Sequence, residues 1–490
     1  MSLADQYFSR WNTQFLVGIV ANSLLYAAFV LLLAVVFLTQ VTHPPAAVTG
    51  WRMAILFVMF GLLAMSVDML ERHKPVSWYG FIAVLAAGVL LIELLSRYRI
   101  ETFGPEGPNT VLLLLVFSAI LVFAVAYPDP RRFLDEQWLF IGAFALVIGL
   151  FFVHIAGTGA APTWPVWASV VAAVSLVVVP RFVPENLFLW TVSIFAAVSA
   201  GIAILSFIFG EFALPFAEVE LWPQTVPLIG SEIEGWYAHT SIYHNVNVFG
   251  LVAFAGLAGS LFLVHRSVVS GTIVASSLAA LLLVVNGIGL LLSSSGAAWI
   301  SAGVVIGFYL PYVALGRKAI IPTFVFAIFG AAIVTVAAYY GHIVLDDSGR
   351  FARWESGIRA FRDGPELFGH GHISTAEFTA PYFDGSPDEP HNSYLDILIR
   401  TGFVGLLAYT VLLLGGLLSG LIRYRTVNVA MLALTFGWAF HHLFESYTMI
   451  QWTIPAVLSA MTLGYLLFSP ASEAETATTT TFNPDPPSGP

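Results

Sequence analysis

The chain is 490 residues long; 58% of its residues are hydrophobic and only 10% are charged. A soluble domain would carry about a quarter charged residues, so this composition excludes an ordinary soluble protein and indicates a polytopic membrane protein. The net charge of −10 excludes the basic surface of a nucleic-acid-binding protein, and the lack of cysteine excludes disulfides, thiolate nucleophiles and cysteine-bound metals.

Fourteen segments have the length and hydropathy of membrane-spanning helices, which need about 20 mostly apolar residues. They are residues 15–38, 51–70, 77–95, 109–126, 137–155, 163–180, 187–209, 246–264, 271–292, 297–315, 319–340, 397–421, 427–446 and 449–468. The first is longer than the apolar stretch of ~7–15 residues in a cleavable signal peptide, so it is expected to stay as a helix. The sequence therefore predicts an all-α polytopic membrane protein with about fourteen transmembrane helices.

Basic residues gather in every second loop between these segments. They are Arg72, Lys74, Arg131, Arg132, Arg181, Arg266, Arg317, Lys318, Arg423 and Arg425. Because short cytoplasmic loops are rich in lysine and arginine, both termini are expected to be cytoplasmic, although Arg97 and Arg99 disagree with this pattern. Two long loops, about 210–245 and 341–396, then face outward. The first is acidic, and the second is the large extracytoplasmic loop that holds most of the polar residues.

A short helix rich in arginine is expected near the start of the second outer loop. Phe351, Trp354, Ile358 and Phe361 recur at helical spacing and form an apolar stripe. The arginines that flank it are Arg350, Arg353, Arg359 and Arg362. The pattern predicts a helix that lies in the membrane interface with its apolar face down. Its guanidinium groups suit a diphosphate, because their forked shape matches phosphate oxygens; pairing with lipid phosphates is the alternative.

Two histidine motifs follow in the same loop. His370 and His372 lie in a Gly-His-Gly-His segment, which favours a tight turn; two histidines without a third ligand are weak evidence for a metal. His391 and Asn392 stand where the loop meets an apolar helix. Imidazole titrates near neutral pH, so His391 can act as a base toward a hydroxyl, or it can be a hydrogen-bonded interfacial histidine. Asn392 also suits a helix N-cap.

Other polar residues gather near the same outer ends of the helices. They are His244, Asn245 and Asn247 at the entry of the eighth segment, Ser293, Ser294 and Ser295 after the ninth, and His441, His442 and Glu445 near the end of the thirteenth. Polar groups at membrane depth are costly, so they usually face a cavity or a partner. Hydrogen bonds between helices are the alternative, favoured for the serines and for Asn245. Asp68, near an inner end, is expected to be structural.

The stretch from Glu234 to Gly402 resembles the O-antigen ligase family, whose shared domain also covers O-antigen polymerases and O-linking oligosaccharyltransferases. The residues that fit its motifs are Arg350, Trp354, Pro365, Gly369, Gly371, His391, Asn392, Gly402, and upstream Gly235 and Asn247. One element departs: the family often has Ser-x-Ser-Arg-Gly between two helices, whereas this chain has Ser293-Ser294-Ser295-Gly296 without the arginine. His244 and Arg353 are the candidates to replace it.

The resemblance implies transfer of a glycan from a polyprenyl-diphosphate carrier to a hydroxyl of a glycan, lipid or protein acceptor outside the cell. His391 would be the base and Arg350 would hold the diphosphate, with no metal or cofactor and with inversion at the sugar. The substrate-binding residues would be Arg353, Asn392, His244, Asn247, Trp354, Gly369 and Gly371. The expected parts are N-terminal helices (1–209), a catalytic membrane region (210–468, including loop 341–396) and a disordered cytoplasmic tail (469–490).

Two other classes of protein remain open at this point. A transporter or flippase for a lipid-linked glycan would also need many helices and interfacial arginines, but transporters place polar sites near the bilayer midplane, whereas these residues crowd the outer ends. An intramembrane hydrolase is disfavoured, because the apolar segments show no Ser/His/Asp or His/Glu metal spacing. The sequence does not distinguish a ligase from a polymerase or from a protein O-glycosylating enzyme.

Overall fold

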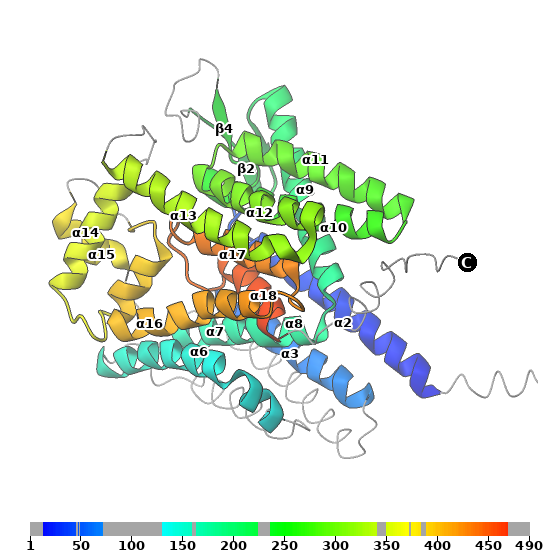
Figure 1. Ribbon diagram of the computed structural model, residues 1–490, viewed down its shortest axis with the longest axis horizontal. Coiled ribbons are helices and arrows are strands. Elements are labelled where there is room, and N and C mark those ends of the chain that lie inside the picture. Colours follow the sequence, from blue (N-terminus) through cyan, green and yellow to red (C-terminus); the bar gives the residue numbers. More distant parts are fainter. Residues whose placement is uncertain are drawn as a thin grey trace, which may run out of the picture.

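The computed structural model describes residues 13–45, 48, 50–71, 130–158, 163–223, 236–340, 349–371, 374–383 and 389–468, and these form a bundle of helices (Figure 1). The helices are α2 (Thr13–Phe37), α3 (Gly50–Glu71), α6 (Pro130–Thr158), α7 (Thr163–Ala173), α8 (Val179–Phe182), α9 (Glu185–Phe209), α10 (Val246–Val269), α11 (Ile273–Ser293), α12 (Gly296–Leu315), α13 (Ile320–Tyr339), α14 (Arg350–Arg362), α15 (Thr375–Thr379), α16 (Ser393–Ile422), α17 (Val429–His441) and α18 (Ile454–Phe468).

The helices confirm a multi-pass, helical membrane protein. Within the described residues, eight helices are long and apolar enough to cross a bilayer, and α17, α18 and part of α3 are shorter apolar helices. The expected segments 77–95 and 109–126, the tail 469–490 and the side chain of Asp68 lie outside the part described. The expected segments 427–446 and 449–468 are too long: α17 ends at His441 and α18 begins at Ile454. The residues between them form turns that belong to the candidate site.

Four short strands, which the sequence analysis did not predict, lie between α9 and α10. Strand β1 (Phe212–Leu214) pairs antiparallel with β2 (Ala217–Val219), and β3 (Leu221–Pro223) pairs antiparallel with β4 (Tyr237–His239). Strand β2 alternates two buried residues with an exposed one, as a half-buried strand does. An isolated bridge between Val41 and Tyr243 ties this loop to the end of α2. The loop is therefore attached to the bundle at the start of α10.

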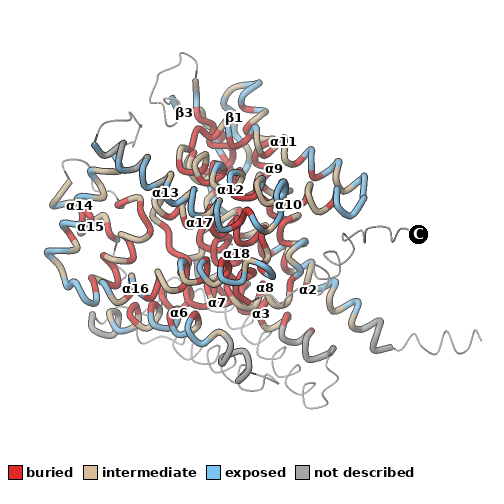
Figure 2. Tube along the Cα trace, viewed as in Figure 1, coloured by how far each residue is buried: buried red, intermediate tan, exposed pale blue. Residues whose placement is uncertain are grey.

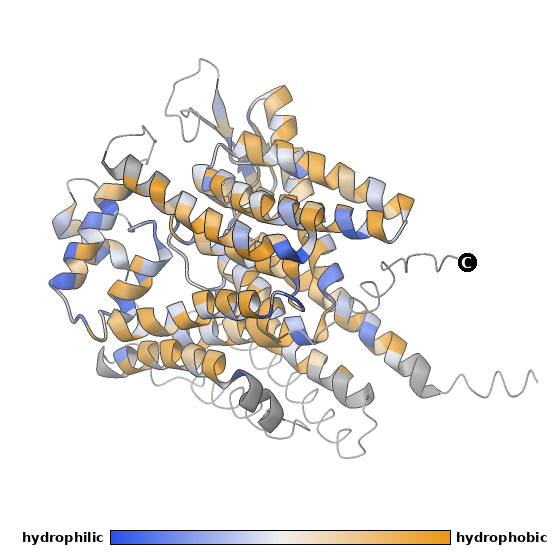
Figure 3. Cartoon of the chain, in the orientation of Figure 1, coloured by the Kyte–Doolittle hydropathy of each residue, from blue (hydrophilic) through white to orange (hydrophobic). Residues whose placement is uncertain are grey.

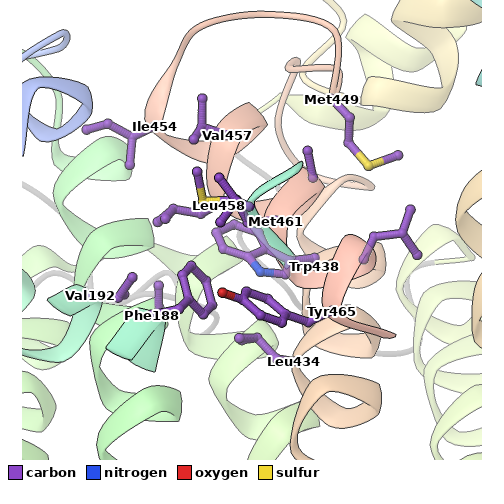
Figure 4. Packing of buried hydrophobic residues seen from close by; sticks show 14 of the residues in the cluster. Phe188, Val192, Leu434, Trp438, Met449, Ile454, Val457, Leu458, Met461 and Tyr465 are labelled. Carbon is purple, nitrogen blue, oxygen red and sulfur yellow. The ribbon is translucent and has the colours of Figure 1, made fainter. Parts of the chain in front are cut away.

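The core lies where α17 and α18 run through the middle of the bundle (Figure 2). Every residue of α18 is buried, as expected of a helix that is apolar on all sides. Figure 4 shows Trp438 and Tyr465 among Phe188 and Met461. Their polar atoms are satisfied, because Trp438 donates to the Thr462 hydroxyl at 3.2 Å and Tyr465 donates to a backbone carbonyl of the α8–α9 turn at 3.0 Å. This core fixes the helices whose ends carry the polar residues.

Several helix ends meet at one end of the bundle. The backbone carbonyl of Gln40, just after α2, accepts from the His244 N–H at 3.2 Å, and the Gln40 side chain accepts from the Ile454 N–H at 3.2 Å. The Ser393 N–H donates to the carbonyl of His442 at 2.8 Å. The starts of α10, α16 and α18 therefore meet the ends of α2 and α17. The hydrophilic helices α14 and α15 lie beside the apolar bundle (Figure 3).

Candidate active site

A single carboxylate, that of Glu445, joins the two side chains expected to be catalytic. Its Oε2 lies 3.4 Å from His391 Nδ1, and its Oε1 accepts a hydrogen bond from Arg350 Nη2 at 3.2 Å. Arg350 Nε also donates to the backbone carbonyl of Phe444 at 3.1 Å. The side chains of His391, Arg350 and Glu445 are 26%, 15% and 14% exposed. Three separate elements, the turns beside α16 and α17 and the start of α14, therefore build one partly buried cluster.

The charges in this cluster support each other. Burial raises the pKa of Glu445, but the hydrogen bond with His391 and the positive charge of Arg350 lower it, and the net pKa lies below its ordinary value. Glu445 is therefore an anion at neutral pH. An anion beside Nδ1 of His391 favours the tautomer with its proton on Nδ1, which leaves Nε2 as the nitrogen that can accept a proton. This is the arrangement of a histidine base oriented by a carboxylate.

The backbone of His391 adopts a left-handed conformation, with φ +46°. Such a conformation is uncommon for a residue other than glycine, and holding it costs about 1–3 kcal/mol. The following residues are firmly attached: the Asn392 N–H donates to Ser446 Oγ at 3.1 Å, and Ser393 Oγ donates to the carbonyl of Glu445 at 2.7 Å. These bonds tie the start of α16 to the turn that carries Glu445, so His391 and Glu445 are positioned together. Backbone strain of this kind is often found at functional sites.

Asn392 is the N-cap of α16. Its buried side-chain oxygen accepts from the N–H groups of Tyr394 at 3.0 Å and Leu395 at 3.1 Å. The structural role considered for this residue in the sequence is thus confirmed. Its expected contact with substrate stays a prediction.

Helix α14 packs against α16 through small residues. Its buried residues are Ser356, Gly357 and Ala360, and a Cβ atom on Gly357 would lie 3.5 Å from Pro390. The apolar stripe expected from the sequence lies on a different face of α14 from these buried residues, and its member Ile358 is 40% exposed. The close approach that small residues allow brings Arg350, at the first position of α14, to the Glu445 turn.

Two more expected substrate-binding residues lie on α14 near Arg350. The ring of Trp354 packs against Phe351, with centroids 5.4 Å apart, and against Phe444, at 6.2 Å. The guanidinium of Arg353 lies 5.7 Å above the ring of Phe383. Both residues are therefore positioned by aromatic contacts beside the cluster.

The glycines of the family motif hold a loop against a break in α16. Gly402 has φ +66° inside that helix, and a side chain there would collide with the backbone of Leu367. Gly369 has φ +71°, and a Cβ atom on it would lie 2.5 Å from the carbonyl carbon of Arg400. The Gly371 N–H donates to the Arg400 carbonyl at 2.8 Å. Close backbone packing therefore accounts for these glycines, and their contact with substrate stays a prediction.

The Gly-His-Gly segment follows a turn at residues 366–368 and bends at His370, so the expected tight turn lies just before it. The ring of His370 stacks on Phe378 with centroids 4.0 Å apart, and burial lowers the pKa of its imidazole. His372 lies outside the described residues. Within the described ranges, no group of three His, Asp or Glu side chains is arranged to hold a metal ion.

The expected residues His244 and Asn247 share a cavity with Glu445. The cavity has a volume of about 180 Å³ and lies between the ends of α2, α10, α17 and α18. His244 is held there because its Nδ1 lies 2.8 Å from the carbonyl of Gln40. Gly235, the upstream glycine of the motif, lies outside the described residues.

The serine turn that lacks the family's arginine lies between α11 and α12. Ser294 has φ +50°, and its hydroxyl accepts from Trp236 Nε1 at 2.9 Å. Ser295 is buried so close to α10 that a Cβ atom on Gly250 would overlap it. The two candidates to replace the arginine, His244 and Arg353, lie respectively in the cavity beside Glu445 and on the helix of Arg350.

Residues 278–410 match the family model described as O-antigen ligase. This confirms the resemblance seen in the motifs, and it supports a membrane protein that transfers lipid-linked glycans. The match spans α12 to α15, most of α11 and the first part of α16, and it includes Arg350 and His391. Glu445 and His244 lie outside it. No curated protein sequence matches the chain.

Proposed function

We propose that this protein is a membrane glycosyltransferase that moves a glycan from a polyprenyl-diphosphate carrier to an acceptor hydroxyl at the outer face of the membrane. The observation that carries the proposal is the cluster in which Glu445 contacts both His391 and Arg350. The O-antigen ligase match supports it independently, because both the histidine and the arginine belong to the matched residues.

The proposed reaction is a single displacement. His391 Nε2 removes the proton of the acceptor hydroxyl as its oxygen attacks the anomeric carbon of the donor sugar. The bond from that carbon to the diphosphate oxygen breaks, and the diphosphate leaves with the electron pair. One displacement inverts the anomeric carbon. The leaving group itself supplies the activation, so the proposed mechanism needs no metal.

Each charged residue of the cluster has a part in this reaction. Glu445 stabilises the imidazolium that forms when His391 takes the proton. Arg350 stabilises the negative charge that grows on the leaving diphosphate. A guanidinium has five N–H donors, so Arg350 can contact Glu445 and a phosphate oxygen in the same complex. Arg353 lies three residues further on the same helix and is proposed to assist in binding the diphosphate.

The test uses purified protein in lipid nanodiscs with a lipid-linked oligosaccharide and candidate acceptors, and identifies the product by mass. We expect His391→Ala and Arg350→Ala each to slow transfer by at least ~10²-fold, because each removes a group that acts in the transition state. Arg359→Ala is the matched control: Arg359 is on the same helix, but its side chain is 57% exposed and pairs with Glu355. Undiminished transfer by folded His391→Ala protein would reject the assignment of the base.

A further inference from the structure

The cavity beside Glu445 is lined mainly by residues with polar side chains. Asn247 and Gln451 contribute amides, Ser446 and Thr453 contribute hydroxyls, and His244 contributes an imidazole. The apolar side chains of Val248, Leu251 and Pro455 also line it. Pockets with a few placed polar groups on an apolar wall bind small molecules through those groups. The residues of this cavity therefore allow its ligand to be inferred from their chemistry.

The charges around the cavity disfavour a phosphate group. No lysine or arginine lines it among the residues described, and Glu445 supplies a carboxylate. Two helices begin at the cavity, and a helix N-terminus attracts anions. At each start one N–H is already bonded, because the Asn245 side chain accepts from the Asn247 N–H at 2.7 Å and the Gln40 side chain accepts from the Ile454 N–H at 3.2 Å. A neutral ligand with hydroxyl groups fits these walls better than a diphosphate.

Two residues that line the cavity each carry a polar atom with unused hydrogen-bonding capacity. In the described part of the chain, His441 Nε2 and Thr453 Oγ1 are buried without a hydrogen-bond partner. His441 is fully buried, and its other nitrogen is bonded to the Tyr447 hydroxyl at 2.8 Å. Buried polar groups nearly always have partners, and each of these two atoms can take up a further hydrogen bond. Ligand hydroxyls can donate and accept, as these two atoms require.

We propose that this cavity binds one neutral sugar ring of a glycan substrate, an inference that rests on the proposed glycosyl transfer. Its volume of about 180 Å³ is smaller than the ~300 Å³ of the smallest usual ligand pockets, which limits it to a single ring. Glu445 lines the cavity and also contacts His391, so one carboxylate connects the site of the ring with the base. The ring belongs either to the donor glycan or to a glycan acceptor, and the experiment separates these two sources.

The chain has no cysteine, so Gln451→Cys places a sole thiol in the cavity. The rate at which a small methanethiosulfonate reagent labels this thiol is measured in nanodiscs. The additions are the polyprenyl-diphosphate-linked oligosaccharide, the acceptor glycan, polyprenyl diphosphate without a glycan, and inorganic pyrophosphate. Gln137→Cys is the matched control, because Gln137 is a half-buried glutamine of α6 that does not line the cavity.

We expect the donor or the acceptor glycan to slow labelling of Gln451→Cys about tenfold at ten times its Kd, since about nine-tenths of the sites are then occupied. The substrate that protects identifies the source of the ring. Labelling of Gln137→Cys should not change. Equal protection by pyrophosphate or by polyprenyl diphosphate would overturn the proposal in favour of an anion or lipid site.

The outcomes also separate this inference from the proposed function. If wild-type protein transfers the glycan but no glycan protects Gln451→Cys, the sugar site is wrong and the transferase stands. If a glycan protects the thiol but wild-type protein transfers nothing, the sugar site stands and the transferase is wrong.

Discussion

Replacing Glu445 with glutamine tests the central cluster most directly, because the change keeps the shape of the side chain and removes its charge. In the structure the carboxylate contacts His391 Nδ1 at 3.4 Å and Arg350 Nη2 at 3.2 Å. A hydrogen bond to a charged group contributes roughly 1.5–3 kcal/mol. Loss of the contact to the imidazolium alone therefore predicts a fall in kcat of about 10- to 150-fold, at 1.36 kcal/mol for each factor of ten. Loss of the correct tautomer as well would raise the effect toward ~10⁴-fold.

The same substitution changes the dependence on pH. Burial raises the pKa of Glu445, but the opposite effect of His391 and Arg350 is larger. The folded protein therefore holds this pKa below that of the unfolded chain. A lowered pKa contributes stability that is present above the unfolded pKa and is lost as the pH falls through the folded one. Wild-type protein should therefore lose stability as the pH falls from the pKa of Glu445 in the unfolded chain through its lower pKa in the folded protein. Glu445→Gln should lack that component of the loss. Its transfer activity should also persist to lower pH relative to its own maximum, because protonated His391 is no longer stabilised.

The assay measures kcat against pH in nanodiscs, together with thermal unfolding at each pH. Glu355→Gln is the control, because Glu355 is a carboxylate of α14 that is 65% exposed and pairs only with Arg359 among the described residues. It should leave both kcat and the pH profile unchanged. Wild-type kcat and an unaltered pH profile in Glu445→Gln would refute the role of Glu445 in orienting the base.

Two further substitutions separate structural from functional roles. Gly369→Ala should lower Tm, because the residue has φ +71° and its new Cβ would lie 2.5 Å from the Arg400 carbonyl carbon, a cost of about 1–3 kcal/mol. Gly303→Ala is the control, because a Cβ atom there meets nothing within 4 Å. Equal Tm values for the two variants would contradict the close packing at Gly369. Asn392→Ala should cost about 1 kcal/mol of stability through loss of the cap, whereas Asn392→Asp keeps the acceptor for Tyr394 N–H and should keep wild-type transfer. A tenfold slower but equally stable Asn392→Asp protein would instead show contact with substrate.

The helices and their polar ends could be predicted because they depend on local sequence. Runs of apolar residues mark most of the described long helices, and the polar pair His391 and Asn392 marks the start of α16. The end of α17 and the start of α18 could not be predicted from such local patterns. The turn between them contains apolar residues such as Phe444 and Ile450, so its hydropathy continues that of the helices. It leaves the helical path because its backbone bonds instead to Ser393.

The role of Glu445 could not be predicted for a related reason. The sequence marks it only as one member of a polar group near the end of a helix. Its partners His391 and Arg350 lie 54 and 95 residues earlier in the chain. No spacing rule for helices or strands reaches that far, because such rules describe neighbours within a few turns. The pairing becomes visible only when α14, α16 and α17 are packed together.

The break in α16 shows what a motif can and cannot say. The glycine eleven positions after His391 is part of the family pattern, but the pattern does not state its purpose. In the structure Gly402 interrupts a helix of 30 residues with a positive φ, and the loop that carries Gly369 and Gly371 fills the interruption. Two backbones meet there without side chains between them. This contact anchors the segment after α14, and with it α14 and Arg350, to the helix that begins beside His391.

The placement of polar side chains also bears on the alternative of a transporter. A transporter needs its polar site near the middle of the membrane-spanning helices. Among the described residues, Asn286 is a buried amide well inside α11, and its Nδ2 donates to the carbonyl of Ser193 and to the hydroxyl of Ser260, both at 3.1 Å. These bonds connect α9, α10 and α11, so this amide serves helix packing. The ionisable cluster of Glu445, by contrast, lies at the ends of helices α14, α16 and α17. That position favours chemistry at the membrane surface over passage through it.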